Sequence, residues 1–512
     1  MLNKNRTVVS KRFFYVCQGV LVGIISGLVV AGFRIGITSL LAGWQKLYHL
    51  SHLHPSYLLA AFFFLVAIGL SVGKMTASQP HIKGSGIPEV EGEIKGRLKL
   101  SAGPILWRKF TGGILVIGSG LYLGREGPCI QLGGAIGKLW GKYFKATASG
   151  QRLLLANGAS AGLSAAFNAP LAATIFVLEE IYHSFSPNIW LSTLASAISA
   201  DLTSMALLGF KPVLDLNGLD PLPLAYYGHL IFLGVALGLL GRVYQIVLLA
   251  MSKFYHRFFA WFNSAFWLLV PLILLLPLGY FFPQTLGGGN QIILHLGRFS
   301  PSLKLLVWLF ILRFIFSMLS YGSGACGGIF LPILTLGGIV GLMYGKIATG
   351  AGFLPEKYDL DLLAFAMAGY FAGISKAPFT AIILVTEMVG NLEHLVPLAL
   401  VSLASYLVID VLDGPPIYDA LLSQMHLPAT GRILSGKNQH LLLTIKSQSW
   451  LVGRQVRDIP WPDSCLLIQI KRKQKNLLPH GDTLLTPGDK LELLVDVSQR
   501  SKVKSFLLNT KP

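Results

Sequence analysis

The chain has 512 residues, of which 53% are hydrophobic and only 13% are charged, and its mean hydropathy is +0.61. Soluble globular domains carry about 25% charged residues, so this composition excludes disorder and a fibrous repeat and argues against a water-soluble enzyme. The 42 Lys and Arg against 23 Asp and Glu give a net charge of +19, which in a multi-pass membrane protein reflects basic cytoplasmic segments and requires no nucleic-acid partner.

The N-terminal segment 1–12 is basic and leads directly into a long apolar run. This run outlasts the apolar core of a signal peptide and has no clear cleavage site, so we expect a retained first helix with a cytoplasmic basic flank. Apolar stretches long enough to span a membrane, or nearly so, lie at about 13–43, 56–73, 105–123, 153–182, 189–208, 222–250, 263–283, 304–320, 328–350, 361–389 and 394–412. Several contain Gly and Pro, or are too long for one crossing and too short for two, which predicts broken or re-entrant helices.

Composition predicts the domain organisation. We expect a basic cytoplasmic N-terminus over 1–12, membrane repeats over 13–210 and 211–422, a linker over 423–431 and a small cytoplasmic α+β module over 432–512. Within the module, apolar or alternating runs predict strands at Leu441–Lys446, Cys465–Arg472 and Lys490–Val497. A helix is predicted around Val452–Ile459.

The membrane part contains an internal duplication. Residues 124–134 (GREGPCIQLGG) and 328–338 (GIFLPILTLGG) share the pattern G-x-x-x-P-x-x-x-x-G-G at an offset of 204. Residues 169–180 (APLAATIFVLEE) and 377–388 (APFTAIILVTEM) align at an offset of 208. Duplicated halves are typical of secondary transporters and related channels. The sequence leaves open whether the halves are parallel or inverted.

Three glycine-rich segments end in a proline that precedes a helix-compatible run: 84–88 (GSGIP), 124–128 (GREGP) and 322–332 (GSGACGGIFLP). Proline near the first position favours a helix start, and glycine lets the backbone expose its N–H groups. Because a helix N-terminus carries a partial positive charge, three converging starts would bind an anion weakly enough to release it. The alternative is that these residues are only packing glycines and helix kinks.

These motifs, together with Tyr418 in the segment 415–418 (PPIY), resemble those of the CLC family of chloride channels and chloride/proton exchangers. The resemblance covers about 13–422. It implies an all-α polytopic membrane fold of two inverted repeats of tilted, broken helices. It also implies a homodimer, with one pathway for chloride and protons in each subunit across a lipid bilayer.

The resemblance also implies roles for individual residues. Ser85, Ile329, Phe330 and Tyr418 correspond to the chloride-binding residues, and Glu126 corresponds to the external gating glutamate. A carboxylate can occupy an anion site as a substitute for chloride and leave when it is protonated. Supporting positions in the pathway motifs are Gly84, Gly86, Pro88, Gly124, Arg125, Gly127, Pro128 and the upstream Lys109. Arg125 has two interpretations, binding an anion or pairing with a carboxylate.

Glu179 and Glu180 follow the Ala169-Pro170 repeat element. Glu387 aligns with Glu179, whereas Met388 aligns with Glu180, so Glu180 has no acidic counterpart in the second half. An acid pair could form a solvated helix end. Glu180, however, resembles the internal proton-transfer glutamate of the exchangers, and acids within membrane segments commonly mark proton relays. This favours a proton-coupled chloride antiporter over a passive channel gated by voltage or protons.

The family pattern is not matched everywhere. Cys129 stands where many relatives have Thr, and Cys326 stands where many have Pro. Neither replacement adds an ionic group. Ser85 favours chloride over nitrate, and Tyr418 with the GREGP motif argues against the fluoride-exporting branch. The cysteines show no metal-ligand spacing, so we expect neither a metal nor a cofactor.

The tail resembles the C-terminal lobe of potassium-transport regulator (RCK, TrkA-C type) domains through the pattern Leu478-Pro479-x-Gly481-Asp482-Thr483-Leu484-x-x-x-Gly488-Asp489-x-Leu491. This implies a module that binds a small regulatory ligand, one that adds a dimer contact, or a passive appendage. A potassium-uptake regulator would need a nucleotide-binding half that the sequence lacks. A membrane-embedded hydrolase would have to use His183 beside Glu179 and Glu180, but no nucleophile motif accompanies it. We therefore expect a bacterial-type inner-membrane transporter with both termini cytoplasmic, and not an enzyme.

Overall fold

The computed structural model forms two compact units, Met1–Met425 and His426–Pro512, which are described separately. It describes residues 2–210, 213–214, 216, 219–260, 262–299, 301–425, 438–459, 461–462, 465–473, 475–496 and 500–508. The predicted linker therefore lies outside the described residues from 426 onward. The predicted boundary between the repeats falls beside residues 211–212, which are also outside them.

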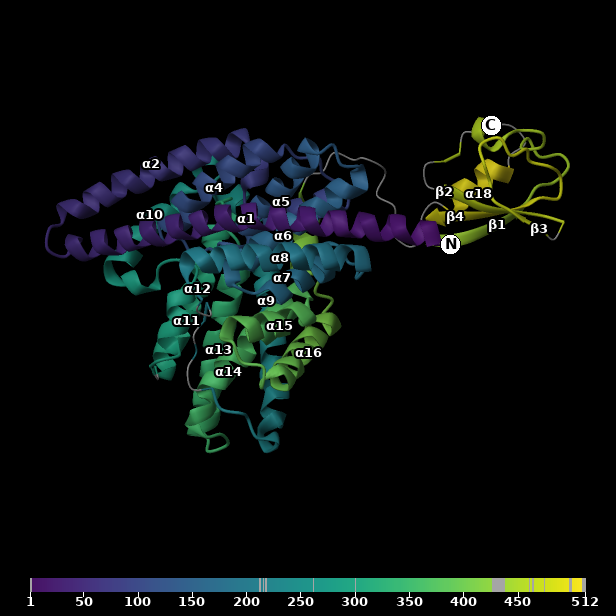
Figure 1. Ribbon diagram of the computed structural model, residues 1–512. Coiled ribbons are helices and arrows are strands. Elements are labelled where there is room, and N and C mark those ends of the chain that lie inside the picture. The colour runs from purple at the N-terminus through teal and green to yellow at the C-terminus, as the bar shows by residue number, and fades with distance from the viewer. Residues whose placement is uncertain are drawn as a thin grey trace. The chain divides into compact units, whose positions relative to one another are not determined.

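The first unit is helical throughout its regular structure (Figure 1). Its first half contains α1 (Leu2–Ser51), α2 (Ser56–Ser78), α3 (Ile87–Ile94), α4 (Ala102–Gly118), α5 (Glu126–Tyr143), α6 (Ala148–Phe167), α7 (Pro170–Phe176) and α8 (Pro187–Leu208). Its second half contains α9 (Tyr227–Phe258), α10 (Leu269–Phe281), α11 (Asn290–Leu296), α12 (Leu303–Gly322), α13 (Phe330–Gly350), α14 (Asp359–Ser375), α15 (Pro378–Val389), α16 (Leu395–Val411) and α17 (Ile417–Gln424).

Some of these helices span a membrane by length and others do not. Among the described residues, seven helical segments are long and apolar enough to cross: Arg12–Ser51, Ser56–Ser78, Ile189–Leu208, Leu224–Phe258, Ser264–Phe281, Leu303–Gly322 and Phe330–Gly350. The apolar stretch 153–182 is divided between α6 and α7 at Asn168, and 361–389 is divided between α14 and α15 at Lys376. Both residues adopt left-handed backbone conformations and precede an Ala-Pro pair. The prediction of broken helices is confirmed at these two places.

The two halves repeat the same packing. In the first half α5 packs on α6, α6 on α8, and α8 along α1; in the second, α13 packs on α14, α14 on α16, and α16 along α9. The first residues of the paired helices are separated by the same offsets as the sequence repeat. Helix α13 begins at Phe330, 204 residues after Glu126 of α5, and α15 begins at Pro378, 208 residues after Pro170 of α7. Helices α7 and α15 pack against each other where the halves meet (Figure 1).

The second unit contains a four-stranded antiparallel sheet in the order β1-β4-β2-β3, followed by α18 (Arg500–Leu508). The strands are β1 (Asn438–Thr444), β2 (Cys465–Arg472), β3 (Lys475–Leu477) and β4 (Lys490–Asp496). Three strands match the predicted ones within a few residues, although Val497 lies outside the described residues. The buried face includes Leu441, Ile470, Leu491 and Leu493, and Val503 of α18 belongs to the same core.

The helix predicted around Val452–Ile459 is wrong. Only one helical turn, η7 (Val456–Asp458), occurs there. Gly453 has a left-handed conformation, with φ of +77°, and the neighbouring backbone bonds to the segment 481–485 instead. The amide of Val456 donates to the carbonyl of Thr483, and that of Arg457 donates to the carbonyl of Gly481.

Candidate functional site

Each glycine-rich motif leads into a helix, as expected from its sequence. Helix α3 begins at Ile87, α5 at Glu126 and α13 at Phe330, so each helix starts one or two residues before its proline. Glu126 and Phe330 therefore occupy equivalent first positions in the two repeats. The first-turn N–H groups of a helix have no partner within the helix, which leaves them available to an anion or a carboxylate.

The starts of α5 and α13 are joined directly. Gly124 and Gly328, which the repeat aligns, exchange two backbone hydrogen bonds of 2.7 Å each. On the other side, a Cβ added at Gly127 would lie 2.7 Å from Cβ of Ser85, so a side chain at Gly127 would displace the loop before α3. The structure thus brings all three motifs together.

Glu126 is enclosed where these motifs meet. Its side chain is 1% exposed, and none of the described residues donates a hydrogen bond to its Oε2 atom. The carboxyl group lies beside the backbone amide of Leu331 in the first turn of α13. Arg125 is an electrostatic neighbour, but its Nε is buried and makes no hydrogen bond to any residue that is described. The Glu126 carboxylate therefore lies next to backbone amides at a helix start, where a free anion could bind in its place.

The ring of Phe176 links Tyr418 to Phe330. The ring centroids of Tyr418 and Phe176 are 6.1 Å apart, and those of Phe176 and Phe330 are 6.0 Å apart. Tyr418 is fully buried, and its hydroxyl has no hydrogen-bond partner within the described part of the chain. It lies within electrostatic range of both Glu180 and Glu126. The phenol is therefore a free polar group with both predicted proton-transfer carboxyl groups nearby.

Ser85 is buried at the start of α3, and its Oγ accepts a bond of 3.3 Å from the amide of Ile87. The hydroxyl of Tyr321 lies next to Gly84 and Ser85. Sequence reasoning missed Tyr321. Its position immediately before the glycine-rich segment 322–332 is the signal that would have indicated it.

Lys109 holds the backbone of the loop that contains Ser85. Its ammonium is fully buried and donates to the carbonyls of Ile82 (2.9 Å) and Gly84 (2.7 Å). The offset of 204 aligns Lys109 with Arg313, another residue that sequence reasoning missed. Arg313 is buried in α12 and donates to the carbonyls of Thr285 (3.0 Å), Gly287 (2.8 Å) and Gly288 (2.5 Å). Extending the repeat upstream of residue 124 would have found this pair.

Glu180 lies in a π-helical turn, η2 (Val177–Ile181), which follows α7. Such turns are rare and frequently occur at functional sites. Its side chain is 4% exposed, and its electrostatic neighbours are Glu91, Asp419, Glu179 and Lys95. Glu180 is therefore not at a solvated helix end. Glu179 is also engaged, because it bonds to the first turn of α15.

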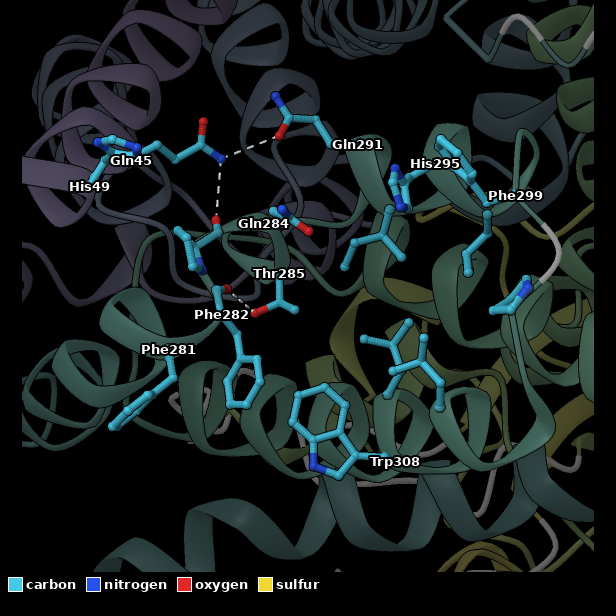
Figure 2. A pocket seen from close by; sticks show the side chains of 16 residues that line it. Gln45, His49, Phe281, Phe282, Gln284, Thr285, Gln291, His295, Phe299 and Trp308 are labelled. Atoms are coloured by element: carbon cyan, nitrogen blue, oxygen red, sulfur yellow. Dashed lines mark hydrogen bonds between the residues drawn. The ribbon is translucent and has the colours of Figure 1, made fainter. Parts of the chain in front are cut away.

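A cavity of about 1010 Å³ lies elsewhere, between the C-terminal part of α1, the turn η5 (Pro283–Thr285), α11 and α12. Figure 2 shows Phe281, Phe282 and Trp308 on one side of it, with Gln45 and Gln291 opposite. Gln45 donates to the carbonyl of Pro283 and to Oε1 of Gln291, both at 3.3 Å. The lining contains none of the predicted site residues, so this cavity is not the predicted anion site.

Comparison with known proteins adds an independent observation. The family model described as voltage gated chloride channel matches residues 64–410, more than half of the chain. The chain belongs to this family, the CLC family. A second model, the TrkA-C domain, matches residues 441–508 of the CLC protein's tail. The family and tail resemblances are both confirmed.

Solved CLC structures are similar to this one over most of its length. A slow cyanobacterial Cl⁻/H⁺ antiporter is 29% identical, with a TM-score of 0.75, over 80% of this chain and 97% of that chain. A CLC-type fluoride/proton antiporter is 22% identical, with a TM-score of 0.63 and the same coverage. A eukaryotic CLC transporter is 20% identical, with a TM-score of 0.69, over 88% of this chain and 80% of that chain. The last two show the fold alone.

Proposed function

We propose that this CLC protein exchanges chloride for protons across a lipid bilayer. In this proposal Ser85, Tyr418 and the first-turn backbone of α13 at Ile329 and Phe330 hold the chloride ion. The carboxylate of Glu126 competes with that ion for the same helix-start amides, and protonation releases it.

Glu180 transfers the proton between the region around Tyr418 and the internal solution. The observation that carries this role is the pair of buried carboxyl groups within electrostatic range of one phenol, Glu126 and Glu180 around Tyr418. The repeat supplies a contrast, since Met388 occupies the position equivalent to Glu180. The likeness to a Cl⁻/H⁺ antiporter supports the same assignment.

Two substitutions test these roles in proteoliposomes that report chloride and proton movement together. In Glu126→Ala the competing carboxylate is gone, so chloride should pass without proton coupling. In Glu180→Val the buried proton carrier is gone, and the same loss of coupling is expected. Glu356→Gln, at an exposed acid in a short 3₁₀ turn (Glu356–Tyr358), is the matched control and should keep both fluxes. Proton movement that persists in both variants would contradict the roles.

A passive chloride channel is the second candidate, because the family model itself describes a channel. In that case the wild-type protein would pass chloride with no uphill movement of protons. We also propose a homodimer in a bacterial-type inner membrane, with both termini cytoplasmic. Light-scattering mass measurement in detergent and protease access to the tail in oriented vesicles test these two assignments.

The tail is proposed to regulate transport by binding a small ligand. The match to the TrkA-C domain supports a regulatory module. Transport should then change when the tail is removed at the segment 426–437, or when a ligand is added to the whole protein. Equal flux and equal stability with and without the tail would contradict a regulatory role.

A further inference from the structure

Four charged or ionisable side chains from three distant parts of the chain meet close to Glu180. Glu91 and Lys95 lie at the end of α3, His183 follows η2, and Asp419 lies in α17. The ammonium of Lys95 donates to Oε1 of Glu91 and, at 2.8 Å, to Oδ1 of Asp419. Lys95 thus holds one oxygen of each carboxylate and orients both groups.

The second oxygen of each carboxylate remains available. Glu91 is 1% exposed, and its Oε2 is buried with no hydrogen-bond donor among the residues that the structure describes. Oδ2 of Asp419 lies 4.0 Å from Nε2 of His183. One ligand atom from each of Glu91, His183 and Asp419 lies within 4.8 Å of the others. The two carboxylates share the single ammonium of Lys95, so the group keeps one formal negative charge, which a bound cation would balance.

Two carboxylates and one imidazole are a ligand set that suits Zn²⁺, with solvent in the fourth position. Zinc bonds of about 2.0–2.2 Å place tetrahedral ligand atoms roughly 3.4 Å apart. The His183–Asp419 separation of 4.0 Å must therefore shorten by about half an ångström, and no pair of ligand atoms needs to shorten by more than about 1.4 Å. Their side chains are 43% and 35% exposed, so they have room for this adjustment. Lys95 would act as the outer partner that fixes the carboxylates, as such groups do in metal sites.

We propose that Glu91, His183 and Asp419 form a binding site for a divalent transition-metal ion, with Zn²⁺ as the fitting probe. The site adjoins the predicted proton route, because Glu91 and Asp419 both act electrostatically on Glu180. A bound ion adds positive charge there and repels incoming protons, so it slows exchange; this consequence rests on the proposed function, whereas the binding does not. Sequence spacing gave no sign of the site because its ligands come from separate segments.

Binding is tested first, by calorimetric titration of Zn²⁺ into the full-length protein in detergent, free of any polyhistidine tag. We expect one ion per chain, and at least tenfold weaker binding in both His183→Ala and Asp419→Asn. His295→Ala, which changes an exposed histidine in the cavity of Figure 2, is the matched control and should bind as the wild type does. Equal affinity in His183→Ala and the wild type would overturn the proposal.

Transport is tested next, in proteoliposomes with Zn²⁺ added to either face. Zinc should slow chloride and proton flux in the wild type and leave His183→Ala unaffected, while the two proteins transport equally in the presence of a chelator. If no coupled transport occurs in either protein, the proposed function fails while the calorimetric result still decides the site. If zinc slows His183→Ala as strongly as the wild type, inhibition through this site is overturned.

Discussion

Glu179 and Glu387, which the repeat aligns at an offset of 208, each accept hydrogen bonds from the first helical turn of the other's repeat element. Glu387 accepts from the amides of Leu171 (3.1 Å) and Ala172 (2.7 Å) at the start of α7. Glu179 accepts from those of Phe379 (3.2 Å) and Thr380 (2.8 Å) at the start of α15. The C-terminal end of each repeat element therefore lies at the N-terminal end of the other, so α7 and α15 run antiparallel. This is the arrangement expected of two inverted halves.

Removing either carboxylate should weaken the contact between the halves. A carboxylate at a helix start satisfies free N–H groups and complements the helix dipole, and its loss costs about 1–2 kcal/mol. Glu179→Ala and Glu387→Ala should each lower the thermal unfolding midpoint in detergent by a similar amount. Glu356→Ala, in an exposed turn, should leave the midpoint nearly unchanged. A loss confined to one of the two glutamates would contradict the reciprocal arrangement.

The sequence was sufficient for the class of fold, the duplication and the helix starts at the glycine-rich motifs, because Gly and Pro act on the local backbone. The repeat alone left the orientation of the halves open, and only the family resemblance implied inversion; the bonds of Glu179 and Glu387 to the opposite helix starts show it in the structure. The tail helix was predicted wrongly because backbone pairing with the segment 481–485 overrides the local pattern. Lys109 was already indicated by the family resemblance, whereas Arg313 could have been found by extending the repeat upstream, because 204 residues separate the two.

Arg313 should contribute strongly to stability, because its buried guanidinium bonds three backbone carbonyls. Arg313→Leu removes the guanidinium donor from three carbonyls, of which that of Gly288 keeps only a 3.4 Å bond from Thr335, and we expect a loss of about 3–5 kcal/mol. Arg313→Lys should recover part of this, since Lys109 serves the equivalent loop with two bonds. Thermal unfolding in detergent measures both, with the exposed Arg298→Leu as control. Equal midpoints for Arg313→Leu and Arg298→Leu would refute the assignment.

Close packing of α5 on α6 depends on glycine. A Cβ added at Gly133 would lie 2.0 Å from the carbonyl oxygen of Gly158, and one at Gly158 would lie 2.0 Å from that of Gly133. Gly133→Ala must push the helices apart, which should cost about 1–3 kcal/mol or more and reduce the yield of monodisperse protein. Gly103→Ala in α4 meets nothing within 4 Å, so it should be neutral or slightly stabilising. Size-exclusion profiles and unfolding midpoints compare the two variants.

Acid should loosen the tail through Asp489, whose side chain is 1% exposed. Burial alone would raise the pKa of Asp489, but two bonds of 2.8 Å from Arg472 and one from the amide of Thr486 hold its pKa below the ordinary value. Because the folded-state pKa is depressed, the stabilisation is complete above the unfolded value of about 3.9 and is lost as the pH falls through the folded value.

Hydrogen exchange of the β4 amides in the full-length protein measures this effect. Protection should fall as the pH drops below about 4, after correction for the intrinsic exchange rate. Asp489→Asn should weaken protection at neutral pH and flatten its pH dependence, whereas the exposed Asp482→Asn should behave as the wild type does. An unchanged pH profile in Asp489→Asn would show that the Arg472 contact does not stabilise the sheet.

Proton pumping by chloride in vesicles tests the exchange mechanism most directly. Vesicles that contain the wild-type protein are loaded with high chloride and diluted into low chloride at equal pH, with a potassium ionophore to hold the membrane potential near zero. An exchanger must move protons into the vesicles as chloride leaves. The outside medium should therefore become alkaline and the lumen acidic, although the pH was equal on both sides at the start. Chloride efflux with no more proton uptake than protein-free vesicles show would contradict the account.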